Sequence, residues 1–319
     1  MKQIKLWGMT LAAAMLVIGA SAQTKEEVGL KMKEAGELIN NKKFVEAIPV
    51  LEEVIKMGQA VGADAVDITT EAQKMLPQLY LQKGVVAVQA KKMDEAIAAF
   101  EKAENLADLQ GDVMTTRKAG RFVSNIYMAI GVNSFNAKDY AKALESFQKG
   151  LAQDTANIQL AYFTAKSYAE LKQLDKAVDL YKQVIAAGAE NSKYEKQAAS
   201  AQADMDNYML VAASEAAQAG DLEKVQTYVA AIPKNADANL LLIQTANNLK
   251  KYDVVVANGD NAYEAQTDEA KKSDVAYLTG VAYQNKGNNA KATEWLTKVT
   301  AGENVAAAKQ LKTDIAAAQ

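Results

Sequence analysis

The chain has 319 residues, with 36 Lys plus Arg against 39 Asp plus Glu, and it contains neither Cys nor His. Without Cys there is no disulfide, thiol nucleophile or Cys-ligated metal site, and without His the commonest general base and neutral metal ligand are missing. The composition therefore predicts a protein that is not an enzyme, with no catalytic, cofactor-binding or metal-binding residues. A pI of about 5.4 and only two Arg also argue against nucleic-acid binding.

The N-terminus resembles a bacterial secretory signal peptide over residues 1–22. Two lysines precede the uncharged apolar stretch Leu6–Gly19, and small residues follow, ending at Ala22. The apolar core is shorter than the roughly 20 residues of a membrane span, although an uncleaved anchor is the alternative. No Cys is present for a lipoprotein. We expect cleavage after Ala22, no transmembrane span afterwards, and a periplasmic or secreted protein.

The rest of the chain is rich in Ala and poor in Pro, which favours helix, and it repeats itself. A short fragment ending in Ala or Val recurs, with a small residue twelve positions earlier and a bulky residue four positions later. The fragment ends at Ala47, Ala96, Ala143, Ala177 and Val225, with two further copies at Val255 and Ala292. The small residues are Ala35, Gly84, Gly131, Ala165, Ala213 and Gly280, and the bulky residues are Leu51, Phe100, Phe147, Tyr181, Val229 and Leu296. Small residues let two helices approach, and the bulky residue fills the space between them, so each unit is predicted to be a helical hairpin.

On these positions the chain resembles the tetratricopeptide repeat family, most closely in the two hairpins whose alanines, Ala143 and Ala177, are 34 residues apart. The resemblance implies an all-α, right-handed superhelical solenoid of antiparallel helix pairs. We expect about seven hairpins over 23–302 and a capping helix over 303–319. Other intervals between the repeated positions are 47 to 49 residues, which predicts lengthened helices at about 68–90 and 112–137.

The inner surface formed by the first helix of each hairpin is the candidate partner-binding groove. In some members of the family a Lys three residues before the small residue and an Asn one residue after it clamp a chaperone's C-terminal carboxylate. No repeat here has that pair, so recognition of a chaperone tail is not supported. The corresponding positions instead supply Met128, Val132, Tyr162, Lys166 and Tyr277. Such side chains can adapt to another chain, or they can simply be buried by packing.

Three further features have a functional and a structural interpretation. Arg117 and Arg121 lie one turn apart on a predicted helix and can face one anionic group, or they can form an internal ion pair. Asp204 and Asp206, like the other acidic pairs, are interpreted as solvated helix surface. Thr155 lies in a short Asp-Thr-Ala pattern that some bacterial O-glycosylation systems use, but a helix-ending turn explains the pattern as well.

These observations favour an exported protein-binding scaffold that holds a peptide or partner protein of the cell envelope on the concave face of the solenoid. The alternative is an envelope glycan- or solute-binding protein that uses Tyr side chains as platforms. An enzyme based on carboxylates or Lys is the third and least favoured class, because His and Cys are missing.

Overall fold

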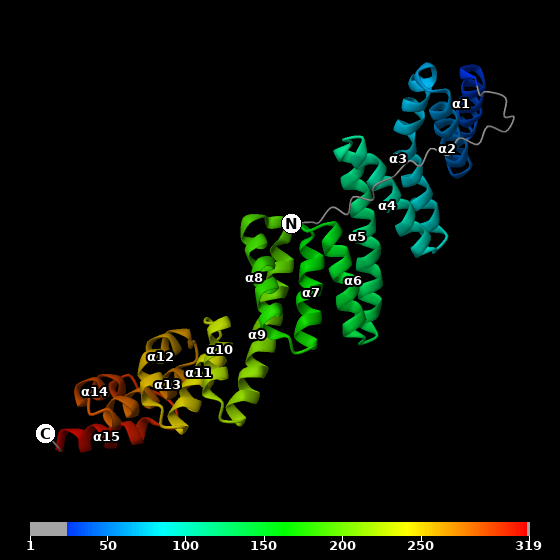
Figure 1. The fold of residues 1–319 in the computed structure, drawn as a ribbon. Coiled ribbons are helices and arrows are strands. Elements are labelled where there is room, and N and C mark those ends of the chain that lie inside the picture. The colour runs from blue at the N-terminus through cyan, green and yellow to red at the C-terminus, as the bar shows by residue number, and fades with distance from the viewer. Residues whose placement is uncertain (1–23, 318–319) are drawn as a thin grey trace, which may run out of the picture. The chain divides into compact units, whose positions relative to one another are not determined.

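The computed structural model describes residues 24–317 (Figure 1). Within that range the chain forms fifteen α-helices and two short 3-10 helices, without strands. The predicted signal peptide, residues 1–22, lies outside the described residues, so its cleavage stays a prediction. From residue 24 to residue 317, no helix combines the length and the apolar character that crossing a membrane requires.

The chain divides into two compact units, which meet in sequence between Ile126 and Tyr127. The first unit contains α1 (Lys25–Asn40), α2 (Phe44–Val61), a 3-10 turn (Ala63–Ala65), α3 (Val66–Gln89), α4 (Met93–Leu109) and the first part of α5 (Val113–Asn136). Here α1 packs on α2, α2 on α3, and α3 on α4. Consecutive helices are thus packed in sequence order, as in a stack of hairpins.

The second unit contains the rest of α5 and ten further helices. They are α6 (Tyr140–Gln153), α7 (Ile158–Glu170), α8 (Leu174–Glu190), α9 (Glu195–Gln218), α10 (Leu222–Ala231), α11 (Ala236–Asn248), α12 (Tyr252–Ala265), α13 (Glu269–Asn285), α14 (Asn289–Thr297) and α15 (Val305–Ala317). A 3-10 turn (Ser192–Tyr194) precedes α9. First helices also contact one another, since α7 packs on α9, α9 on α11, and α11 on α13. They therefore line a common face of this unit.

The small and bulky repeat positions pack as the sequence predicts. A Cβ built on Gly84 would lie 2.5 Å from the Phe100 ring, and one on Gly131 would lie 2.4 Å from the Phe147 ring. A Cβ built on Gly280 would lie 2.8 Å from the Leu296 side chain. The bulky residues at all six positions are buried. Because a methyl group would not fit at these glycines, the close approach of the two helices of a hairpin depends on the missing side chain.

The irregular repeat spacing comes from the first helices. The predicted lengthened helices are confirmed as α3 and α5, each of 24 residues. A third helix of 24 residues, α9, follows the same pattern, whereas α7 has 13 residues. About three extra turns in a first helix therefore separate neighbouring repeats more widely without inserting a disordered loop.

The turn inside each hairpin uses a left-handed residue that the sequence analysis did not identify. Five residues before each repeated Ala or Val, the backbone has a positive φ. These residues are Lys42, Lys91, Lys138, Lys172, Gly220, Lys250 and Gly287. In the first hairpin the next amide, that of Lys43, donates to the Leu38 carbonyl at 2.9 Å, which closes a Schellman motif. A Lys in this conformation is strained, because its Cβ approaches the following carbonyl.

Candidate functional site

Helix α7 presents two parallel rows of side chains with different environments. Its core row is Ala161, Ala165 and Ala169, all buried. One position further along lies a second row, Tyr162, Lys166 and Glu170, whose members are half-buried. Consecutive residues of a helix are rotated by about 100°, and residues four apart lie on one face. The alanine row therefore packs into the core while the second row borders the face formed by the first helices.

Helix α9 places a matching row beside it. The Tyr162 hydroxyl donates to Asp204 Oδ2 at 2.6 Å, and the Tyr208 hydroxyl donates to Glu170 Oε1 at 2.5 Å. Each helix thus supplies a tyrosine to a carboxylate of the other helix. We call Tyr162, Lys166, Glu170, Asp204 and Tyr208 the tyrosine–carboxylate cluster. It is the candidate functional site, because it concentrates half-buried charge and aromatic surface on the face of the first helices.

Lys166 is held firmly within this cluster. Its ammonium lies 3.1 Å from Asp204 Oδ2, 5.6 Å from the centroid of the Tyr162 ring and 5.9 Å from that of Phe135. The Lys166 side chain is 25% exposed. Ammonium groups are attracted to the negative face of an aromatic ring, so two rings and one carboxylate together make a cation-binding environment.

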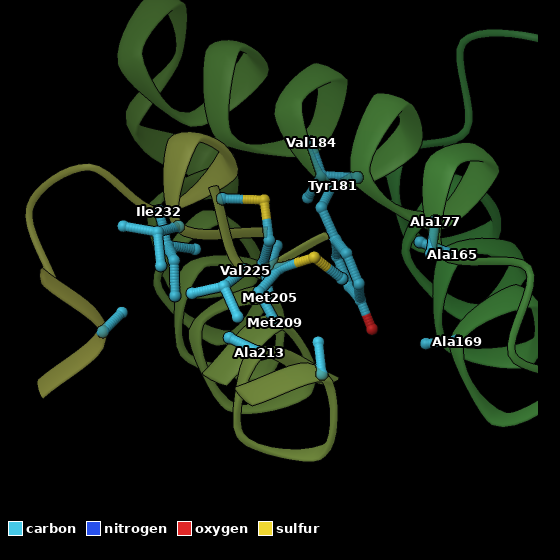
Figure 2. Close-up of a cluster of buried hydrophobic side chains, with 14 of the residues drawn as sticks. Ala165, Ala169, Ala177, Tyr181, Val184, Met205, Met209, Ala213, Val225 and Ile232 are labelled. Atoms are coloured by element: carbon cyan, nitrogen blue, oxygen red, sulfur yellow. The ribbon is translucent and has the colours of Figure 1, made fainter. Parts of the chain in front are cut away.

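Tyr181 of α8 forms the floor of the cluster. Its side chain is fully buried, and its ring centroid lies 6.4 Å from that of Tyr162. The hydroxyl nonetheless has no hydrogen-bond partner in the described part of the chain. Figure 2 shows this hydroxyl directed into the space between α7, which carries Ala165 and Ala169, and α9, which carries Met209. A buried donor and acceptor without a partner is uncommon and requires an explanation.

The tyrosines of the cluster remain protonated far above neutral pH. Burial, reinforced by the carboxylate that each hydroxyl contacts, raises the pKa of Tyr162 and of Tyr208. Burial and the nearby Glu170 carboxylate also raise the pKa of Tyr140, the first residue of α6. The phenols therefore stay neutral, and each O–H remains available to donate to a carboxylate. Two carboxylates against one ammonium leave the cluster with a net negative charge at neutral pH.

The other predicted groove residues lie in different surroundings. Met128 and Val132 of α5 are half-buried and pack against the core around Phe147. Tyr277 of α13 lines a separate hollow of about 560 Å³. Helix α13 is the last of the first helices that contact one another in the order α7, α9, α11 and α13. Of the five predicted groove residues, the tyrosine–carboxylate cluster therefore contains only Tyr162 and Lys166.

The hollow beside Tyr277 is lined mainly by polar side chains. Gln244 and Asn248 come from α11, Asp274 from α13, and Asn304 from the segment before α15. The Asn304 amide donates to Asp274 Oδ1 at 2.8 Å, so part of this polar surface is already satisfied within the chain.

The remaining predicted positions are at the surface. Arg117 and Arg121 are exposed on α5, one turn apart. Thr155 is exposed in the turn between α6 and α7, where its glycosylation stays a prediction.

Glu170, Tyr208 and the Tyr181 hydroxyl were not predicted from the sequence, and the interpretation of Asp204 as solvated surface is wrong. Asp204 is not solvated surface, because its side chain is 28% exposed and contacts both Tyr162 and Lys166. A useful signal was present: aromatic and charged residues recur at four-residue spacing on α7 and again on α9. Such a polar row beside a buried alanine row marks a helix that faces something other than its own core.

Residues 77–108, from the middle of α3 to near the end of α4, match the family model for the tetratricopeptide repeat. No curated protein matches the chain. The chain is similar to solved structures that include MamA, at 19% identity with a TM-score of 0.29, covering 56% of this chain and 90% of MamA.

Two more are similar at the same level. YrrB, described as a TPR protein with an unusual peptide-binding site, has 20% identity and a TM-score of 0.26, covering 55% of this chain and 83% of YrrB. A tetratricopeptide repeat protein from Parabacteroides merdae has 11% identity and a TM-score of 0.27, covering 91% of this chain and 99% of the other. At these values no binding residue can be transferred from one chain to the other.

Proposed function

Because the chain carries a tetratricopeptide repeat, we propose that it is a non-enzymatic scaffold that binds a segment of another protein on the first-helix face of α7 and α9. The observation that carries the proposal is the tyrosine–carboxylate cluster on that face. Its side chains are accessible, aromatic and charged, as in the anchoring centre of many protein interfaces. Val211 lies about two turns beyond Asp204 on α9, and it is a 46% exposed apolar side chain that extends the same surface.

The alternative glycan-binding function needs open aromatic platforms, and the cluster offers few. The Tyr162 ring is packed against Phe163 at 5.5 Å and Tyr181 at 6.4 Å, and Lys166 lies over it. A sugar ring stacking there would have to displace these neighbours. A protein partner that contacts the edges of the aromatic rings and the polar groups of the cluster fits the geometry better.

Site-specific photocrosslinking in the native host tests the proposal. A photoreactive amino acid at position 211 is expected to form adducts with another polypeptide, identifiable by mass spectrometry. The matched control carries the same amino acid at position 182 of α8, where Lys182 is also exposed but borders a hollow lined mainly by residues of α8 and α10. Equal labelling from both positions, or none from position 211, contradicts the proposed binding face.

We further propose that this scaffold is exported to the periplasm or secreted, and that its partner is a protein or peptide of the cell envelope. The proposal is supported by the charged, apolar and small-residue segments that end at Ala22. The intact mass of the protein purified from its host is expected to correspond to a chain beginning at Gln23. A mass that includes Met1 contradicts cleavage.

A further inference from the structure

The tyrosine–carboxylate cluster contains two similar halves, and only one holds a cation of this chain. In the Lys166 half-site, Asp204 and the rings of Tyr162 and Phe135 surround the Lys166 ammonium. In what we call the Glu170 half-site, Glu170 is joined by Tyr208, which donates to it, and by the neighbouring Tyr140. Both half-sites combine a carboxylate with tyrosine.

The Glu170 half-site lacks an internal cation. Among residues 24–317, no Lys or Arg nitrogen pairs with Glu170, and none lies over the ring of Tyr140 or Tyr208. Lys172, two residues further along, pairs instead with Glu215 at 3.4 Å. Lys166, one turn before Glu170, is already engaged by Asp204. The half-site thus presents a carboxylate and two phenols without the positive charge that its counterpart holds.

The Tyr181 hydroxyl is a second, independent observation within the same cluster. The equivalent repeat position is Phe100 in α4 and Phe147 in α6, so a phenyl ring is sufficient to fill the space inside a hairpin. The additional oxygen in α8 is therefore unnecessary for packing, and it is buried without a partner. The hydroxyl lies between α7 and α9 (Figure 2), and burial together with the nearby Asp204, Tyr208, Tyr162 and Glu170 raises the pKa of Tyr181. The hydroxyl is therefore an unsatisfied acceptor within the cluster, covered by neighbouring side chains in the free protein.

We propose that the Glu170 half-site binds a Lys or Arg side chain of the partner segment. This inference rests on the proposed scaffold function and specifies the chemistry of its partner. Glu170 accepts the hydrogen bonds of the cation, the rings of Tyr140 and Tyr208 flank it, and the Tyr181 oxygen accepts from below. The arrangement of Lys166 in the neighbouring half-site shows how such a cation is held.

An anionic ligand fits this surface poorly. It would approach two carboxylates, and the single ammonium nearby is already paired with Asp204 at 3.1 Å. A basic ligand instead brings the charge that offsets the net negative charge of the cluster. Arg is favoured over Lys where the fork of the guanidinium can reach both Glu170 and the Tyr181 oxygen.

The test uses N-acetyl-arginine methylamide as the probe and the uncharged isostere N-acetyl-citrulline methylamide as its control. Binding to the full chain is followed by NMR of ¹³C-ring-labelled tyrosines, with the Tyr140 and Tyr208 signals assigned from Phe variants. The arginine probe is expected to shift both signals saturably, and citrulline is not. Glu170→Gln is expected to weaken arginine binding at least tenfold, because a charge-assisted hydrogen bond is lost. Glu215→Gln, which removes an exposed carboxylate of α9, is the matched control and leaves binding unchanged.

Two results overturn the inference: citrulline binding as tightly as arginine, and arginine binding unaffected by Glu170→Gln. A Tyr181→Phe variant that binds arginine as tightly as the original chain removes Tyr181 from the site.

Crosslinking from position 211 keeps the arginine test separate from the test of the scaffold proposal. If crosslinks form but arginine does not bind, the scaffold proposal is retained and the proposed cation site is refuted. If arginine binds but no crosslinks form, the scaffold proposal falls.

Discussion

Replacing Tyr181 with Phe is expected to stabilise the protein. The substitution removes a hydroxyl that is buried without a partner and keeps the ring that fills the hairpin. Leaving such a group unsatisfied costs about 1–3 kcal/mol. Removing it leaves a void of roughly 10 Å³, which costs about 0.2 kcal/mol at 24 cal/mol per Å³. The free energy of unfolding of the second unit is therefore expected to rise by about 1–3 kcal/mol.

Two matched variants test the sign of this effect. Phe147→Tyr places a new hydroxyl at the equivalent buried position of α6 and is expected to destabilise the protein by about 1–3 kcal/mol. Tyr208→Phe removes a hydroxyl that donates to Glu170 at 2.5 Å, and it is expected to cost about 1.5–3 kcal/mol. If the three variants change stability in the same direction, the argument from hydrogen-bond satisfaction is wrong.

The assay must resolve local stability, because a long repeat array need not unfold in a single step. Urea unfolding followed by far-ultraviolet circular dichroism gives the overall change. Hydrogen exchange of amides in α7, α8 and α9 gives the local opening free energy around Tyr181. A loss of more than 1 kcal/mol of local stability in Tyr181→Phe would mean that the hydroxyl has a partner in the native protein. The floor of the proposed cation site would then need another explanation.

Three further predictions concern the repeats and the first unit. Gly131→Ala is expected to lower the unfolding free energy by about 1–3 kcal/mol in urea titrations, because its Cβ would overlap the Phe147 ring. Gly36→Ala, with no atom within 4 Å of its Cβ, is expected to raise it by up to about 1 kcal/mol, and equal effects would refute the packing argument. Lys138→Gly is expected to stabilise by about 0.5–1 kcal/mol through relief of the left-handed backbone, and a loss of thermal stability would contradict this. Burial and Glu52 raise the pKa of Tyr80 from 10.0 to about 12, so the stability it contributes is complete below pH 10 and is lost as the pH rises towards 12. Tyr80→Phe should flatten the dependence of stability on pH over that window, and an unchanged slope would refute the assignment.

The core of the hairpins was predictable because a single relation repeats along the chain. Gly131 and Phe147 are sixteen residues apart, as are Gly84 and Phe100, and in both pairs the ring occupies the space that the missing side chain leaves. Local spacing determines this contact, since a short turn joins the two helices. The left-handed turn position also recurs along the sequence. Five of its residues are Lys rather than the usual Gly, so the residue type did not reveal the turn.

The candidate site was predictable only in part, because it joins hairpins rather than helices within one hairpin. Tyr162 and Lys166 were identified from their positions in the sequence, three residues before and one residue after Ala165. Their partner Asp204 belongs to α9, which has 24 residues where α7 has 13. Which turn of a long helix faces which turn of a short one depends on how the two hairpins stack. That register follows from the packed core and cannot be read from repeat spacing.

On helix α7 the packed row and the row of the proposed binding site are one residue apart. Its alanine row reaches full burial at Ala165, whereas Glu170 on the adjacent row is half-buried and makes no contact in the hydrophobic core. Substitutions in the alanine row would enlarge a side chain where neighbouring helices already touch, and they would act on stability. Replacing Glu170 with Gln keeps the shape of the side chain and an acceptor for Tyr208, and it removes only the charge. A binding defect of that variant would therefore report on the charge of the half-site rather than on the integrity of the array.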